Sequence, residues 1–128
     1  MTRTIAFGSP SDEAVRVYEL VRRAQAAGVE AVASGVRAAA VDEAARESLR
    51  QAGYEFGHST GHGIGLEVHE EPALRKDSAD VLVEGNAVTV EPGVYLPGEL
   101  GVRIEDTVIV RKDGCEIITR SPKELVVV

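Results

Sequence analysis

The apolar pattern of this chain changes its period once, close to Gly53, and this change limits the folds that the chain can adopt. Before Gly53, apolar residues recur at the spacing of one buried helical face. After Gly53, short runs rich in β-branched residues are typical of strands. Helices first and strands second predict an α+β fold, in which two helices pack on one face of a mostly antiparallel sheet.

Two helices are expected in the first half of the chain. Ser9-Pro10-Ser11-Asp12 offers an N-cap, a proline at the first helical position and an acid in the first turn. The apolar spacing predicts a helix that begins there and runs to Ala33, with Gly35 as its stop. A second helix is predicted over Ala38–Ala52, with Gly53 as its C-terminal cap.

The second half of the chain is expected to form strands. The β-branched runs Val88–Val90 and Val102–Val110 predict two of them. Asp113-Gly114 is typical of a hairpin turn that returns into a strand over residues 115–119. Glu70-Glu71-Pro72 is interpreted as a solvated loop.

Composition excludes several classes of protein. With 128 residues and 44% hydrophobic side chains, the chain suits one compact domain and not a disordered segment. A formal net charge of −7 argues against a nucleic-acid partner. No apolar stretch approaches the ~18–20 residues that span a membrane, and no signal peptide is evident, so we expect a cytoplasmic protein without membrane partners. The single cysteine, Cys115, is interpreted as an incidental thiol.

All three histidines, His58, His62 and His69, lie within the glycine-rich segment Gly57–Glu70. The glycines oppose a helical zinc site, and their spacing does not match a dinucleotide-binding loop. An extended segment remains, in which His62 is a metal ligand while His58 and His69 carry protons or contact substrate. Three ordinary hydrogen-bonded histidines are the alternative.

Two carboxylates favour the metal hypothesis. Glu91 ends the run Ala87–Val90, and Glu105 lies within an apolar strand, where a buried carboxylate is costly unless it is paired or binds a metal. Arg103 lies on the same strand face as Glu105, so an ion pair with Glu105 or a neighbouring acid is its simplest role. One imidazole and two carboxylates suit a divalent ion such as Mn, Co or Zn. The alternative places both glutamates at a sheet edge, facing water.

Three blocks of sequence, in this order and at this spacing, resemble the pita-bread metallopeptidases, a family that includes Xaa-Pro aminopeptidases, Xaa-Pro dipeptidases (prolidases), methionine aminopeptidases and creatinases. The blocks are Gly57–Glu70, Thr89–Tyr95 and Gly101–Asp106. Glu-Pro-Gly followed by Val-Tyr, and Val-Arg-Ile-Glu-Asp, resemble the proline-specific branch. The resemblance extends from Thr2 to Leu125, which implies a partial creatinase/aminopeptidase fold over residues 1–128.

The resemblance implies a role for each candidate residue. His62, Glu91 and Glu105 would bind metal, with Glu105 bridging two ions, and Glu91 would also handle the proton of the bridging water. His58 and His69 would lie on the substrate side, and Arg103 would be a catalytic arginine beside the ligand strand. The implied reaction is hydrolysis of the Xaa-Pro bond in a peptide with proline at the second position, by a hydroxide held between two metal ions.

Two aspartate ligands of the family have no counterpart in this chain, because the matching text begins just after the second of them. We therefore expect the chain to be the C-terminal portion of a catalytic domain, with weak metal binding at one site at most and little activity alone. A missing N-terminal segment or self-pairing as a homodimer would account for the absent half. A non-catalytic peptide-binding module and a creatinase-like, metal-independent hydrolase are the alternative functions.

Overall fold

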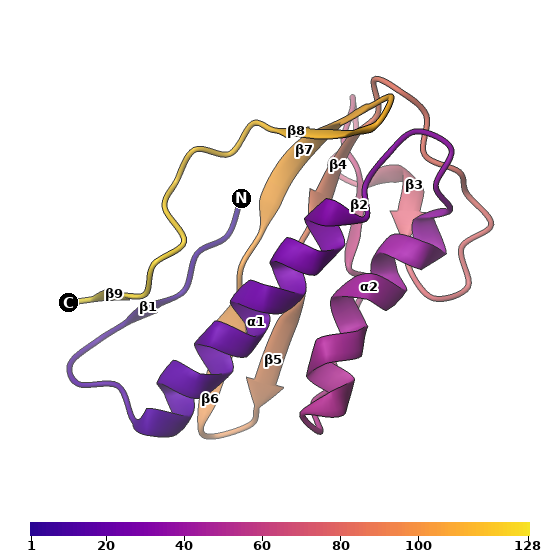
Figure 1. Ribbon diagram of the computed structural model, residues 1–128. Coiled ribbons are helices and arrows are strands. Elements are labelled where there is room, and N and C mark those ends of the chain that lie inside the picture. Colours follow the sequence, from indigo (N-terminus) through magenta and orange to yellow (C-terminus); the bar gives the residue numbers. More distant parts are fainter.

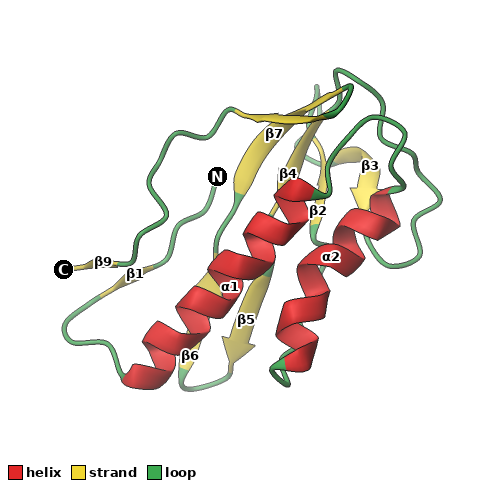
Figure 2. Cartoon of the chain, viewed as in Figure 1, coloured by secondary structure: helices red, strands yellow, loops and turns green.

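A computed structural model describes residues 1–128, and it consists of a helix pair that covers one face of an antiparallel sheet (Figures 1 and 2). The helices are α1 (Asp12–Glu30) and α2 (Ala38–Gln51). In spatial order, the strands of the main sheet are β3 (Glu70–Leu74), β2 (Gly61–Gly63), β4 (Ala87–Val90), β7 (Asp106–Arg111) and β8 (Gly114–Ile117). Every neighbouring pair is antiparallel, which confirms the predicted α+β class.

Two smaller strand pairs complete the structure. The hairpin of β5 (Gly93–Leu96) and β6 (Leu100–Arg103) packs against α1. The short strands β1 (Ile5–Ala6) and β9 (Val126–Val127) pair in parallel and bring the N-terminal and C-terminal segments side by side (Figure 1). No helix has the length and apolar character that a membrane span requires.

The helix boundaries differ from the prediction for local reasons. Ser11, and not Ser9, is the N-cap of α1, and its hydroxyl accepts the N–H of Ala14. Pro10 therefore precedes the helix. The helix ends at Glu30, because the N–H groups of Ser34 and Gly35 bond to the sheet and to its flanking loop instead of to helical carbonyls.

Close packing of neighbouring side chains explains why a glycine lies inside α1. A Cβ atom on Gly28 would lie 2.8 Å from the Val90 side chain and 3.2 Å from that of Ala45. The glycine therefore lets α1 pack tightly against both α2 and β4. The apolar core lies between the helix pair and the sheet, in two clusters of buried residues.

Two strand predictions were wrong. The segment Glu70–Leu74 is strand β3 and not a loop, because it pairs with β2 at the edge of the sheet. An edge strand tolerates a proline such as Pro72, since that backbone position needs no ladder hydrogen bond. The predicted strand Val102–Val110 is divided, because Ile104 and Glu105 leave the β5–β6 hairpin and cross into the main sheet as β7.

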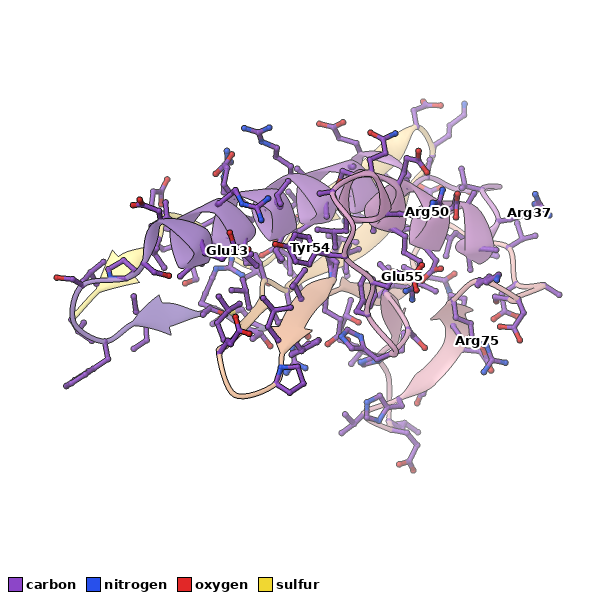
Figure 3. The ribbon with its side chains drawn as sticks, turned by 90° about the horizontal axis from the view of Figure 1, so that it is seen from below. Glu13, Arg37, Arg50, Tyr54, Glu55 and Arg75 are labelled. Carbon is purple, nitrogen blue, oxygen red and sulfur yellow. The ribbon has the colours of Figure 1, made fainter.

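A surface contact ties the segment after α2 to α1. The Tyr54 hydroxyl donates to Glu13 Oε1 at 2.6 Å, and the two side chains lie next to each other in Figure 3. The pKa of Glu13 is lowered, first by its hydrogen bond from Arg16 and then by that from Tyr54. The contact fixes the chain at the point where it leaves α2 for the glycine-rich segment.

Candidate functional site

A cleft of about 490 Å³ lies where the ends of several strands meet. Its walls come from the glycine-rich segment before β2, from β2 and β3, and from the ends of β4 and β6. Five of the six predicted site residues line this cleft: His58, His62, His69, Glu91 and Arg103. The structure thus brings together side chains that lie as far apart in the chain as residues 58 and 103.

The His62 ring is oriented by its own strand. Its Nδ1 atom lies 2.9 Å from the carbonyl oxygen of Gly63. A carbonyl only accepts, so Nδ1 carries the proton, and in the neutral ring Nε2 carries the lone pair. A backbone carbonyl that holds Nδ1–H in this way is the usual partner of a metal-binding histidine.

That lone pair faces a carboxylate. His62 Nε2 lies 3.2 Å from Glu91 Oε1, and both side chains are mostly buried. Two acceptors at this distance repel each other unless a proton or a cation lies between them. An imidazole nitrogen and a carboxylate oxygen are donors that suit a borderline divalent ion, so this pair fits such an ion as two of its ligands.

Thr89 joins the two halves of this pair. Its hydroxyl accepts the backbone N–H of His62 at 3.1 Å and donates to Glu91 Oε1 at 2.9 Å. The Thr89 side chain is buried, so water does not compete for these bonds. Thr89 was not predicted as a site residue, although its position two residues before Glu91 on a strand places both side chains on one face.

A second buried network lies beneath the cleft and was also missed. Asp42 of α2 accepts the hydroxyl of Thr60 at 2.7 Å and the side chain of Arg46 at 2.7 Å. The carbonyl of Thr60 accepts the backbone N–H of Glu91 at 2.6 Å. Arg46 also donates to the carbonyls of Phe56 and His58. Helix α2 therefore fixes the backbone of the segment before β2, and through Thr60 it also fixes the backbone of Glu91.

Gly61 allows β2 to approach β4 closely enough for these contacts. A Cβ atom there would lie 1.8 Å from the carbonyl oxygen of Thr89, which no side chain can accommodate. Any larger residue at position 61 would push the strand that carries His62 away from the strand that leads to Glu91.

The other two histidines also line the cleft. The His58 Nδ1 atom lies 2.7 Å from the Ser59 carbonyl, so Nδ1 donates and Nε2 accepts the hydroxyl of Tyr95 at 2.9 Å. The His69 ring stacks edge-on against that of His62, with 4.3 Å between the ring centroids. The His69 ring therefore lies beside that of His62, whereas the His58 ring lies against Tyr95 on the wall of the same cleft.

Arg103 faces Glu91 and not Glu105. Its Nε lies 3.9 Å from Glu91 Oε2, which is too long for a hydrogen bond, and this buried nitrogen has no other partner. The expected ion pair with a neighbouring acid is therefore present, but as a loose one. Glu91 thus keeps one carboxylate oxygen, Oε2, free of hydrogen bonds.

Glu105 lies apart from the cleft. Its carboxylate contacts the N-terminal ammonium of Met1 at 3.3 Å and accepts the hydroxyl of Thr2. No group of three His, Cys, Asp or Glu side chains gathers into a potential metal site anywhere in the structure. The structure therefore pairs His62 with Glu91 but does not bring Glu105 to them.

Asp106, next to Glu105, is fully buried and fully paired. It accepts from Arg3 at 2.7 Å, from Gln25 at 3.0 Å and from Lys123. Burial alone would raise its pKa, but the hydrogen bonds from Lys123 and Arg3 outweigh it and hold the pKa of Asp106 below its ordinary value. Arg3 also donates to the carbonyl of Glu105, so this network fixes the backbone there.

Cys115 takes no part in the cleft. Its thiol is half-buried and contacts the carbonyl of Val29 at 3.5 Å. Burial raises the pKa of this thiol, which keeps it protonated and unreactive.

The helix pair on antiparallel sheets agrees with the pita-bread fold, which solved structures similar to this chain share. The chain belongs to metallopeptidase family M24, whose family model matches residues 1–112. The resemblance seen in the three sequence blocks is thereby confirmed.

Known proteins similar to this chain include proline-specific peptidases. The solved structure of the Xaa-Pro dipeptidase from Bacillus anthracis superposes with a TM-score of 0.96 at 52% identity, covering 98% of this chain and 36% of that one. The Xaa-Pro dipeptidase of Pyrococcus furiosus is 45% identical over 98% of this chain and 36% of its own length. The X-prolyl aminopeptidase from Caenorhabditis elegans, described as a cytosolic enzyme with a di-nuclear active site, has a TM-score of 0.71 at 30% identity, over 80% of this chain and 17% of that one.

The chain therefore spans about a third of the length of the dipeptidases it matches.

Proposed function

We propose that this chain is the metal-bearing part of a peptidase that hydrolyses the Xaa-Pro bond in a peptide with proline at the second position. The observation that carries the proposal is the 3.2 Å contact between His62 Nε2 and Glu91 Oε1, two acceptors that a divalent cation would reconcile. Membership of family M24 and the similarity to Xaa-Pro dipeptidases support the reaction class.

His62 and Glu91 are the proposed ligands in the cleft, and Glu105 is proposed as a third ligand in the complete catalytic domain, where the site would hold two ions. Manganese, cobalt and zinc all accept this set of nitrogen and oxygen donors. Bound there, the ions would polarise the substrate carbonyl and lower the pKa of a water molecule. Like the relative with a di-nuclear site, the protein is proposed to act in the cytoplasm.

The side chains around the pair have proposed roles that follow from their positions. Glu91 receives the proton of the attacking water on Oε2, the carboxylate oxygen that has no hydrogen bond in the structure. His69 stabilises the charge that develops on the substrate carbonyl, because its ring lies beside that of His62. His58, held by Tyr95, and the exposed end of Arg103 contact the peptide from the cleft wall.

Metal binding tests this proposal directly. Calorimetric titration of the chain with Mn²⁺ should show weak binding at a single site, and the variants His62→Ala and Glu91→Gln should each weaken that binding by about tenfold or more. Glu84→Gln is the matched control, because Glu84 is an exposed carboxylate remote from the cleft residues. Unchanged affinity in His62→Ala would contradict the site, and two tight sites per chain would contradict the expected weak binding.

Activity separates this proposal from its alternatives. The chain alone should hydrolyse a proline dipeptide very slowly, and any such hydrolysis should stop when a chelator is added. Activity that persists with the chelator would favour the creatinase-like reaction instead. Binding of a proline peptide without metal and without hydrolysis would favour the peptide-binding module. Light scattering measures the molar mass in solution and so tests whether the chain pairs with itself as a homodimer. A monomeric mass would contradict self-pairing.

A further inference from the structure

We infer that Thr89 is a positioning residue, whose hydroxyl sets the distance between the two proposed ligands His62 and Glu91. This inference rests on the proposed function, because it is the proposed function that makes His62 and Glu91 metal ligands. The underlying contact is a single buried hydroxyl that touches both the strand carrying His62 and the side chain of Glu91.

The direction of both hydrogen bonds follows from chemistry. The hydroxyl has one proton, and the backbone N–H of His62 can only donate, so Thr89 Oγ1 accepts that bond at 3.1 Å. An ionised carboxylate can only accept, so the hydroxyl proton goes to Glu91 Oε1 at 2.9 Å. Both bonding directions of the hydroxyl are therefore used within the site.

The oxygen that Thr89 holds is the one that faces His62. Glu91 Oε1 accepts the Thr89 proton and lies 3.2 Å from His62 Nε2. Arg103 approaches the other oxygen, Oε2, only to 3.9 Å. Thr89 therefore supplies the hydrogen bond that fixes the carboxylate, and without it the side chain of Glu91 is free to rotate away from the imidazole.

Thr89 also holds the backbone of His62 in place. Strand β2 pairs with β4 through Gly63 and Val88, and the bond from the His62 N–H to the Thr89 side chain adds a further tie at the central residue of β2. Partners that orient metal ligands in this way typically change metal affinity by 10–100-fold when they are removed. The same size of effect is expected here.

Three variants and two measurements test the inference. Thr89→Val removes the hydroxyl at nearly constant volume, and Thr89→Ser keeps the hydroxyl while it removes the methyl group. Thr107→Val is the matched control, because Thr107 lies opposite Thr89 on β7. The variants are titrated with Co²⁺ and followed by visible absorption, and metal-free crystal structures of the wild type, Thr89→Val and Thr89→Ser are compared.

Thr89→Val should weaken Co²⁺ binding by at least about tenfold, whereas Thr89→Ser and Thr107→Val should stay within about threefold of the wild type. In the crystals, Glu91 should leave His62 in Thr89→Val and keep its place in Thr89→Ser. Equal affinity and an unmoved Glu91 in Thr89→Val would overturn the inference, as would an equal loss in Thr89→Ser or Thr107→Val.

Different results would refute the proposed function and this inference. If the wild type binds no Co²⁺, the proposed metal site is refuted, and the metal-free crystal structures alone decide whether Thr89 places Glu91. If Thr89→Val does not fold, Thr89→Ala removes the same hydroxyl and takes its place in both measurements.

Discussion

Glu91 and Asp106 are both largely removed from water, but their surroundings are opposite. Asp106 is fully buried and accepts from two cations and an amide, so its charge is satisfied on every side. The carboxylate of Glu91 accepts one hydrogen bond, from Thr89, and it has a loose contact with Arg103 and an imidazole lone pair opposite it. The saturated carboxylate has no capacity left for a ligand, whereas the unsaturated one keeps that capacity.

The comparison teaches where stability and chemistry lie in this fold. Asp106 connects the N-terminal segment, α1, β7 and the C-terminal segment, through Arg3, Gln25 and Lys123. Glu91 connects only neighbouring strands, and it does so at the wall of a cleft. We therefore expect changes at Asp106 to alter folding and changes at Glu91 to alter ligand binding.

The largest expected effect is that of Asp106→Ala on folding. The substitution leaves Arg3 and Lys123 without their partner, and breaking a buried ion pair from one side costs about 3–5 kcal/mol of unfolding free energy. Urea denaturation followed by circular dichroism measures this loss. Glu99→Ala, on an exposed turn, is the control and should stay within about 0.5 kcal/mol of the wild type. A small loss in Asp106→Ala would show that the two carboxylates do not differ as proposed.

A smaller effect is expected from pH, and it should depend on Asp106. Its folded-state pKa lies below the ordinary value of 3.8, because the hydrogen bonds from Lys123 and Arg3 outweigh the effect of burial. The stabilisation it provides is therefore complete above that value and is lost as the pH falls through the lowered folded-state pKa. Urea midpoints should drop steeply below about pH 4 in the wild type and less steeply in Asp106→Asn. Equal slopes in the two proteins would contradict this assignment.

The smallest expected effect is that of Glu91→Gln on the metal-free protein. A glutamine keeps one contact in either orientation of its amide: its oxygen can accept from Thr89, or, with the amide flipped, its nitrogen can donate to the lone pair of His62 Nε2. The unfolding free energy should therefore change by less than about 1 kcal/mol, in either direction. Urea denaturation in the presence of a chelator checks this. A loss as large as that of Asp106→Ala would mean that Glu91 is a structural charge.

Local patterns in the sequence were sufficient to predict most of the fold. Helix α2 and the hairpin turn at Asp113-Gly114 follow from periodicity and from glycine at the right places, and the structure confirms both. The strand β3 could not be found in this way, because Glu70-Glu71-Pro72 is a polar sequence and becomes a strand only through pairing with β2. Tertiary pairing overrides local preference at such an edge.

In the candidate site too, some residues were predictable from local sequence and others were not. The cleft gathers His58, His62, His69 and Glu91 as the glycine-rich segment and the following strands predicted. Asp42, Thr60 and Thr89 were missed, because their roles depend on contacts between α2, β2 and β4 that leave no signal in spacing or composition. Glu105 was expected beside His62, but Met1 and Thr2 occupy its carboxylate in the structure, so its ligand role stays a prediction.

The close approach of β2 and β4 at Gly61 limits any attempt to transfer the His62–Glu91 pair to another protein. The carbonyl of Thr89 occupies the volume that a Cβ atom would need, so the His–Glu geometry is a property of the interstrand gap and not of the two side chains alone. Grafting an imidazole and a carboxylate onto a regularly spaced β-ribbon would reproduce the chemical groups but not their separation. A designed scaffold must first reproduce the close backbone contact between the two strands.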